Sequence, residues 1–263
     1  MTKQVVVYAF AGLCTTAAVI AGCKSKQPEA PAVAVATPEV AAPVFQVDPA
    51  TAGSVHGTVT YIGPRPKPQV IDMSSDPQCV KAHVGKQYDE SLLVNGKGAL
   101  RDAFVYVSKG LEGKHFAVPQ EPVTIDQKGC WFRPRVLGVQ VGQAFDVTNS
   151  DPVTHNIHPM PKDNREWNHS QGPGDPPMHR KFTHVEIGIP VKCNIHAWMH
   201  ADINVVDSPY FAVTKDDGSF DLPNLPPGTY TVTAWHEGLG TQEATITVAA
   251  SGKVEQNLQF HAK

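Results

Sequence analysis

The chain has 263 residues, of which 41% are hydrophobic, and a formal net charge of −3 at pH 7. The small net charge and the lack of a basic patch interleaved with aromatic residues exclude nucleic acid as an expected partner. Apart from the N-terminal segments described next, about 210 residues remain, enough for one large or two small domains.

The first 22 residues have the pattern of an export signal. Lys3 gives a short positive region, and the apolar stretch of residues 5–20 has the length of a signal peptide rather than of a membrane span. The stretch ends at residues 20–23 with the letters IAGC, which resemble the bacterial lipobox, where the signal is cut before a cysteine that receives lipid. The resemblance implies removal of residues 1–22 and lipidation of Cys23. An ordinary buried helix is the alternative.

Residues 23–52 predict a flexible tether. They are rich in Pro, Ala, Val and Glu and have almost no aromatic residue, so they cannot bury a core. Together with the lipobox, the tether predicts a protein anchored in the bacterial cell envelope on the periplasmic face. Lys24 is not the aspartate that retains enterobacterial lipoproteins in the inner membrane, so the outer membrane is favoured if the cell is Gram-negative.

Beyond the tether, the pattern predicts an all-β protein. Short runs of Val, Ile, Thr, Phe and Tyr are separated by Gly, Pro, Asn and Asp, and polar and apolar residues alternate over 55–61, 103–107 and 230–235. A short helix is expected around Asp76 to His83, because an Asp followed by Pro is a helix start signal.

The C-terminal part contains two turn signals between alternating strands. We expect Asp217 and Gly218 to close a hairpin and Pro227 and Gly228 to form a turn. The patterns T-x-x-x-G-x-F at residues 214–220 and L-P-P-G-x-Y at 225–230 resemble the carboxypeptidase regulatory-like, transthyretin-like β-sandwich.

The opening strands of that sandwich have their matches much earlier in the chain. Its G-x-V-x-G strand matches residues 53–57 and its A-x-V-x-V strand matches residues 103–107. We therefore predict a split sandwich, formed by residues 53–117 and 208–263, with a second β-domain at 118–207 inserted between its halves. Two sequential domains with a boundary near Asp207 are the alternative.

The cysteines predict one disulfide. Cys14 would leave with the signal and Cys23 would be lipidated, so three cysteines remain in the folded part. In an oxidising compartment two of these three can pair. Cys193 has metal-ligand residue types nearby and the other two do not, which favours a bond between Cys79 and Cys130. Two separately buried thiols are the alternative.

The inserted segment contains residue types that bind a metal. Residues 193–199 place a thiolate, an imidazole and a thioether at C-x2-H-x2-M, and soft sulfur with imidazole suits copper that cycles between Cu(I) and Cu(II). A second imidazole would have to come from a distant loop, and His155 is a candidate. Half of a zinc site would show the same Cys and His spacing, so zinc is an alternative metal.

Residues 123–207 contain further short motifs around the candidate ligands. These are F-x-P at 132–134, V-x-x-G at 139–142, N-x-D at 149–151 and H-N-I at 155–157, followed by the C-x2-H-x2-M loop. Together they resemble the cupredoxin family of blue copper proteins, with a ligand loop similar to that of amicyanin. Within that loop, Ala197 and Trp198 replace the Pro and Phe of the family pattern, and Thr154 replaces the proline before the first histidine. The resemblance implies a Greek-key β-sandwich that holds one copper ion.

The resemblance also implies a role for each residue of the site. The expected ligands are His155, Cys193 and His196, with Met199 as the axial sulfur or His200 in its place. Asn156 would brace the cysteine loop by hydrogen bonds. The family arrangement brings the edge of His196 to the surface through an apolar collar that includes Trp198. Packing of Trp198 inward between the two domains is the alternative.

These expectations favour a one-electron carrier rather than an enzyme, because the ligand set leaves no free coordination position. The expected partners are a redox protein, such as a c-type cytochrome or a respiratory or oxidase complex, and the membrane through the lipid anchor. No small-molecule substrate is expected. A non-redox copper-binding or delivery lipoprotein and a surface binding module are the alternative functions.

Overall fold

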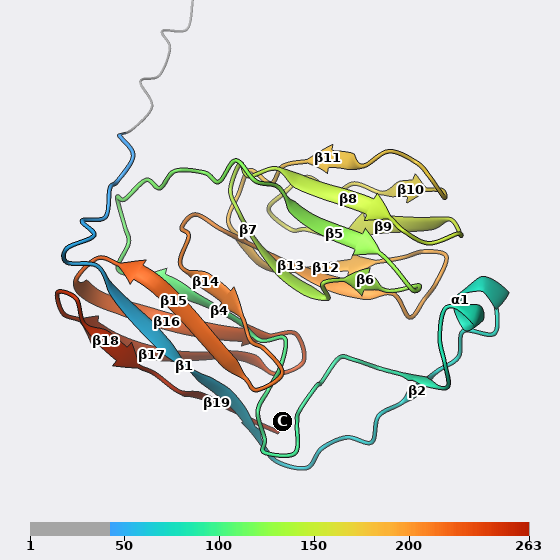
Figure 1. Ribbon diagram of the computed structural model, residues 1–263, viewed down its shortest axis with the longest axis horizontal. Coiled ribbons are helices and arrows are strands. Elements are labelled where there is room, and N and C mark those ends of the chain that lie inside the picture. Colours follow the sequence, from blue (N-terminus) through green and yellow to red (C-terminus); the bar gives the residue numbers. More distant parts are fainter. Residues whose placement is uncertain (1–42, 263) are drawn as a thin grey trace, which may run out of the picture. The chain divides into compact units, whose positions relative to one another are not determined.

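The computed structural model describes residues 43–262 (Figure 1). The predicted signal peptide, the lipidation site Cys23 and residues 23–42 of the predicted tether lie outside the described residues. No helix in the described part of the chain is long and apolar enough to cross a bilayer. The described residues belong to one compact unit, and their structure is all-β apart from one short helix.

The expectation of a flexible tether is wrong for its last residues. Val44 forms a parallel bridge with His115, and the amide of Phe45 donates to the His115 carbonyl at 2.6 Å. The Phe45 ring meets the edge of Phe116 with ring centroids 5.8 Å apart. This aromatic side chain gives the segment apolar surface to bury, so the ordered chain begins before residue 52.

The first β-sandwich, which we call the split sandwich, draws its strands from both ends of the described chain. One sheet has the order β15-β1-β18, with β19 also paired to β1, and the other has the order β14-β4-β16-β17. The strands are β1 (Gly53–Ile62), β4 (Phe104–Lys109), β14 (Phe211–Val213), β15 (Ser219–Leu225), β16 (Gly228–His236), β17 (Gly240–Val248), β18 (Lys253–Glu255) and β19 (Leu258–His261).

The alternation of β1 explains its place in this sandwich. Val55, Val59 and Tyr61 are buried in the sandwich core, and the alternate residues His56, Thr58 and Thr60 are more exposed, as expected for a strand with one face on a core. Its neighbours β18 and β19 run parallel to it and β15 runs antiparallel.

The second sandwich, which we call the inserted sandwich, is formed by strands that lie between the halves of the first in sequence. Its sheets have the orders β10-β9-β12-β13-β7 and β11-β8-β5-β6. The strands are β5 (Val123–Gln127), β6 (Phe132–Arg133), β7 (Val136–Gln140), β8 (Phe145–Asn149), β9 (His155–Pro159), β10 (His169–Gln171), β11 (Met178–Arg180), β12 (Glu186–Lys192) and β13 (His200–Val206).

A long connection leaves the split sandwich after β1 and returns before β4. We call residues 63–98 the α1 lobe; it contains β2 (Val70–Ile71), α1 (Pro77–Lys81) and β3 (Gln87–Tyr88). The helix begins as the sequence predicts, because Asp76 caps it by accepting hydrogen bonds from the amides of Gln78 and Cys79. Figure 1 shows the lobe extending away from β1.

An apolar cluster joins the two sandwiches. Phe104 of β4, Val136 of β7 and Val206 of β13 are buried together, with partly buried side chains from both sandwiches around them. All five residues of β7 are buried, because Leu137 and Val139 face the core of the inserted sandwich while Val136 faces the split sandwich. The sheets approach closely where Gly138 lies against the rings of Phe104 and Phe211.

This close approach predicts the effect of adding one methyl group. A Cβ at position 138 would lie 2.5 Å from ring carbons of Phe211, so Gly138→Ala is expected to destabilise the fold by about 1–3 kcal/mol through overpacking. Gly96→Ala is the matched control, because no atom lies within 4 Å of a Cβ placed there. The measurement is chemical denaturation of both variants. Equal losses of stability would contradict the proposed packing.

A buried ion-pair group lies beside this interface. Arg135, which is 5% exposed, pairs with Glu237 of the split sandwich and lies 3.8 Å from Asp202 of β13. Burial, reinforced by the nearby Glu237 carboxylate and opposed by Arg135, raises the pKa of Asp202 to about 7. The folded state therefore keeps a proton on Asp202 at pH values where the unfolded chain has released it.

This proton predicts a pH dependence of stability. Between the ordinary Asp pKa of 3.8 and about 7, the unfolded chain binds fewer protons, so the free energy of unfolding falls as pH rises, by at most about 1.4 kcal/mol per pH unit. Asp202→Asn is expected to remove this contribution. Denaturation at pH 5 and at pH 7, about two pH units apart, measures the contribution of Asp202. Exposed Asp221→Asn is the control. If the free energy of unfolding of Asp202→Asn changed with pH as it does in the wild type, the raised pKa would not belong to Asp202.

Candidate metal centre

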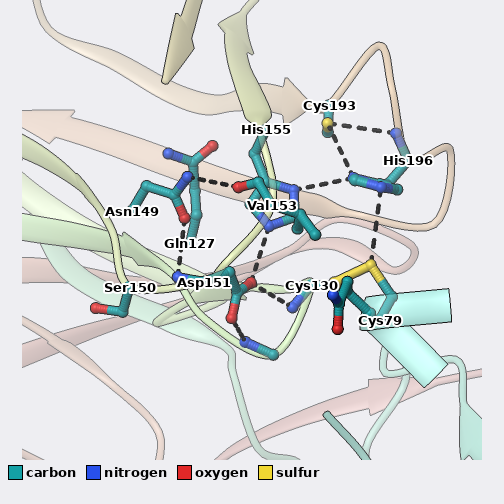
Figure 2. A network of polar contacts seen from close by, with 12 residues as sticks. Cys79, Gln127, Cys130, Asn149, Ser150, Asp151, Val153, His155, Cys193 and His196 are labelled. Carbon is teal, nitrogen blue, oxygen red and sulfur yellow. Dashed lines mark hydrogen bonds and ion pairs between the residues drawn. A yellow bond between two sulfur atoms is a disulfide. The ribbon is translucent and has the colours of Figure 1, made fainter. Parts of the chain in front are cut away.

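Three of the predicted ligands come together in the interior of the inserted sandwich. His155 begins β9, Cys193 directly follows β12, and His196 lies in the loop before β13. One candidate ligand atom from each lies within 4.8 Å of the others, and all three residues are buried. Figure 2 shows the two imidazoles pointing toward each other, with the Cys193 sulfur above them.

The loop from Cys193 to Met199 is held by its own hydrogen bonds. The amide of Cys193 donates to the Met199 carbonyl at 3.1 Å, and the amide of Met199 donates to the His196 carbonyl at 3.0 Å. The His196 amide also donates to the Cys193 sulfur at 3.3 Å. The C-x2-H-x2-M spacing thus forms a compact turn that fixes the thiol and the imidazole relative to each other.

The hydrogen bonds of the two histidines define which nitrogens face the centre. The Nε2 of His155 lies 2.8 Å from Asp151 Oδ2, and the Nε2 of His196 lies 3.2 Å from Asp76 Oδ2. Each Nε2 must therefore carry a hydrogen, because a carboxylate accepts and does not donate. The Nδ1 atoms lie 2.9 Å apart, and the Nδ1 of His196 lies 3.9 Å from the Cys193 sulfur.

Two neutral imidazoles in this arrangement would point lone pairs at each other. A shared proton or a metal cation between the Nδ1 atoms resolves this conflict, so the site fits a cation. Two imidazoles and a thiolate are the donor set that suits copper, whereas structural zinc sites use four Cys, His or carboxylate ligands. Among the described residues, the cluster that contains Cys193 supplies three such ligands.

The surroundings of the three residues shift their pKa values in different directions. Burial by itself would lower the pKa of His155, but hydrogen bonds with Asp151 and Cys193 outweigh it and raise that pKa. Burial would raise the pKa of the Cys193 thiol, but the hydrogen bond with His155 and nearby backbone amides lowers it. Burial lowers the pKa of His196 despite Asp76. The site thus favours a thiolate, which is the form that binds metal.

Asn156 lies where the sequence expectation puts it. Its Oδ1 accepts a hydrogen bond from the amide of Asn194 at 2.6 Å and lies 3.4 Å from the Cys193 sulfur. Its Nδ2 donates to Asn168 at 2.8 Å, which fixes the orientation of the amide. The side chain therefore ties β9 to the start of the ligand loop.

The two axial candidates occupy different environments. Met199 is fully buried in the core of the inserted sandwich. His200 is half-buried, and its Nδ1 donates to the Trp198 carbonyl at 2.9 Å, so this nitrogen is already engaged. The choice of Met199 as axial ligand stays a prediction, and the hydrogen bond of His200 favours it.

The edge of His196 does not reach the surface, contrary to the sequence expectation. His196 is 2% exposed, and its Nε2 faces Asp76 and, at 3.7 Å, the sulfur of Cys79. Trp198 neither surrounds an exposed edge of His196 nor packs between the two sandwiches. Its ring lies 5.1 Å from that of His196, and its Nε1 donates to the carbonyl of Cys130. The expectation failed because the covering residues come from the distant α1 lobe.

A disulfide joins Cys79 of α1 to Cys130 of the inserted sandwich, with Cα atoms 5.6 Å apart. Among the described cysteines, Cys193 is the free one. The bond lies directly beside the metal centre (Figure 2).

Sequence reasoning missed both carboxylates that hold the histidines. Asp151 belongs to the N-x-D motif four residues before His155, and its other contacts are the amides of Gly129 and Cys130 at 2.6 and 2.7 Å. Its position in that motif was an available signal. Asp76 offered no such signal toward the site, because it lies far from His196 in sequence and its visible local role is helix capping.

Comparisons with known proteins found a family model, a curated relative and similar solved structures. Residues 198–261 match the model of the carboxypeptidase regulatory-like domain. This match starts in the ligand loop, before the predicted boundary at 208, although β13 pairs within the inserted sandwich. A 57-residue segment is 35% identical to rhamnogalacturonate lyase A of Emericella nidulans, and it covers 22% of this chain and 11% of the lyase. The matched part is thus a small fraction of that enzyme.

Solved structures similar to this chain include cupredoxins. The copper-containing nitrite reductase of Thermus scotoductus is 21% identical, with a TM-score of 0.32, over 38% of this chain and 26% of the reductase. A purple cupredoxin of Nitrosopumilus maritimus is 21% identical, with a TM-score of 0.28, over 32% of this chain and 99% of that protein. An oxidised amicyanin variant is 16% identical, with a TM-score of 0.29, over 39% and 98% of the two chains.

The carboxylate partner of His155 predicts a measurable effect on metal binding. The negative charge of Asp151 holds the imidazole of His155 and increases its basicity. Asp151→Asn removes this charge, so Cu(II) affinity is expected to fall by about 10–100-fold. Competition with a chelator of known affinity measures the change, and exposed Asp221→Asn is the control. Equal affinity in both variants would show that Asp151 does not support the ligand.

Proposed function

We propose that this protein is a one-electron carrier with a single copper ion held by the Nδ1 atoms of His155 and His196 and by the sulfur of Cys193. The observation that carries the proposal is the convergence of these three atoms in a buried site, with both Nε2 atoms already bound to carboxylates. Copper in such a site would supply a one-electron change between Cu(II) and Cu(I).

The protein's own contribution is to hold the ligands in place and to exclude water. Cys193 and His196 are 3% and 2% exposed and His155 is fully buried, so neither a substrate nor bulk water reaches the ligand atoms. The His196 amide donates to the sulfur, and the Asn156 side chain accepts from the Asn194 amide next to Cys193, which together keep the thiolate in position. A closed and rigid site favours electron transfer over catalysis, which needs an open position, and it disfavours a delivery protein that must release copper readily.

We also propose that the carrier works at the periplasmic face of a bacterial envelope, held by lipid on Cys23. The support is the signal and lipobox pattern of residues 1–23. A disulfide in the folded part fits an oxidising compartment. The proposed partner is a redox protein such as a c-type cytochrome or an oxidase complex, which would exchange electrons with the anchored carrier.

The visible spectrum tests the copper site. Copper-loaded wild-type protein is expected to show a strong thiolate-to-copper absorption band that a one-electron reductant bleaches, and Cys193→Ser is expected to lose it. Cys79→Ser/Cys130→Ser keeps Cys193 and is expected to keep a thiolate-to-copper band. A band that survives in Cys193→Ser, or copper loading without a band in the wild type, would refute the proposal.

The stability of bound copper separates a carrier from a delivery protein. The buried ligands predict slow loss of copper to a chelator under conditions where the protein stays folded. The measurement is the rate at which the absorption band disappears after chelator addition, with circular dichroism to follow folding. Rapid and complete transfer from the folded protein would favour the delivery function instead.

A further inference from the structure

The α1 lobe is anchored to the inserted sandwich by several independent contacts. The disulfide joins Cys79 to Cys130, and the Nε2 of His83 lies 2.6 Å from the carbonyl of Gly129. Arg133 forms two hydrogen bonds with Glu90, at 2.5 and 3.0 Å. Further apolar anchoring comes from side chains of the lobe that pack into the core of the inserted sandwich, including Met73 and Cys79.

These anchors bring one carboxylate to a metal-ligating histidine. Asp76 uses Oδ1 to cap α1, through the amides of Gln78 and Cys79, and this leaves Oδ2 facing the Nε2 of His196 at 3.2 Å. Each oxygen of this carboxylate therefore has its own task. The helix cap fixes the direction of the Asp76 side chain, and the disulfide at Cys79, within α1, fixes the position of the helix.

We infer that Asp76 is a positioning residue of the metal centre, supplied by the α1 lobe, and that it holds His196 in the tautomer that binds copper. The inference rests on the proposed function. Asp76 would accept the Nε2 hydrogen of His196, which leaves Nδ1 free for the metal and makes the imidazole a stronger donor. The negative charge would stabilise the doubly charged ion more than the singly charged one and so lower the reduction potential.

The same contact gives the lobe a function beyond stability. His196 is 2% exposed because Asp76 and Cys79 cover its edge, so the lobe separates the ligand from any partner protein. The two histidines are held in the same way, because Asp151 accepts a hydrogen bond from the Nε2 of His155 as Asp76 does from the Nε2 of His196. One carboxylate comes from the inserted sandwich and the other from the α1 lobe, and the complete metal centre requires both.

Two substitutions separate the carboxylate from the helix cap. Asp76→Asn keeps an oxygen that caps the helix, since Asn is as good an N-cap as Asp, but it removes the charge. Asp76→Glu keeps a carboxylate and weakens the cap. Asp72→Asn is the control, because Asp72 lies in the same lobe and its oxygen accepts a hydrogen bond from the Ser74 amide, as an Asn oxygen also can.

The first measurement uses metal-free protein and does not depend on copper. Long-range ¹H–¹⁵N spectra report the tautomer of each histidine and the exchange of its ring hydrogen with water. The wild type and Asp72→Asn are expected to show His196 with a protected hydrogen on Nε2. In Asp76→Asn this hydrogen is expected to exchange faster, and Asp76→Glu is expected to restore part of the protection. A hydrogen on Nδ1 of wild-type His196, or equal exchange in all variants, would overturn the inference.

The second measurement uses copper-loaded protein. Asp76→Asn is expected to have a higher reduction potential than the wild type and Cu(II) binding weaker by about 10–100-fold, while Asp72→Asn matches the wild type. Asp76→Glu is expected to lie nearer the wild type than Asp76→Asn. Potentials that follow the strength of the helix cap rather than the carboxylate would overturn the inference.

The two measurements distinguish the failure of the inference from the failure of the proposed function. If wild-type protein gives no thiolate-to-copper band, the proposed function is wrong, and the metal-free spectra still decide whether Asp76 holds His196. If the band is present and Asp76→Asn behaves as Asp72→Asn does, the proposed function stands and Asp76 has no positioning role.

Discussion

Strand β1 pairs on both of its edges with strands from the C-terminal part of the chain, β15 on one side and β18 and β19 on the other. These hydrogen bonds satisfy the backbone of β1 only if the ends of the described chain lie together. The segments between β1 and β4 and between β4 and β14 must therefore leave this sandwich and return to it. The α1 lobe is the first such segment and connects β1 of one sheet to β4 of the other. The inserted sandwich is the second, and it leaves after β4 and returns at β14 of the same sheet.

The α1 lobe and the inserted sandwich meet at the candidate metal centre. The inserted sandwich contributes His155, Cys193 and His196, and the lobe contributes the carboxylate of Asp76. A disulfide, an ion pair and apolar contacts hold them together, so the centre is a product of the whole unit rather than of one sandwich. A buried cation and a buried thiolate would each need fixed charged or hydrogen-bonding groups nearby, and this arrangement supplies such groups.

Local patterns predicted a large part of the fold. The alternation at residues 55–61 and the turn residues Asp217 and Gly218 follow from periods and turn chemistry that act over a few residues. The start of α1 at Asp76 and Pro77 was predictable for the same reason, since a helix cap is a local hydrogen bond. The packing of Phe45 against Phe116 was not predictable from composition, because one aromatic ring can anchor a segment whose other residues are typical of a flexible tether.

The sequence by itself determined which types of side chain are available at the candidate site. A cysteine, a histidine and a methionine at C-x2-H-x2-M form one turn, and the N-x-D and H-N-I motifs supply the partners that lie near in sequence. Tertiary structure alone decided that both Nδ1 atoms converge, that His196 is covered, and that Asp76 meets its Nε2. The physical reason is that the hydrogen bond made by one imidazole nitrogen decides which way the other nitrogen faces. For His196 that hydrogen bond goes to Asp76, in a segment that no local sequence pattern connects to the site.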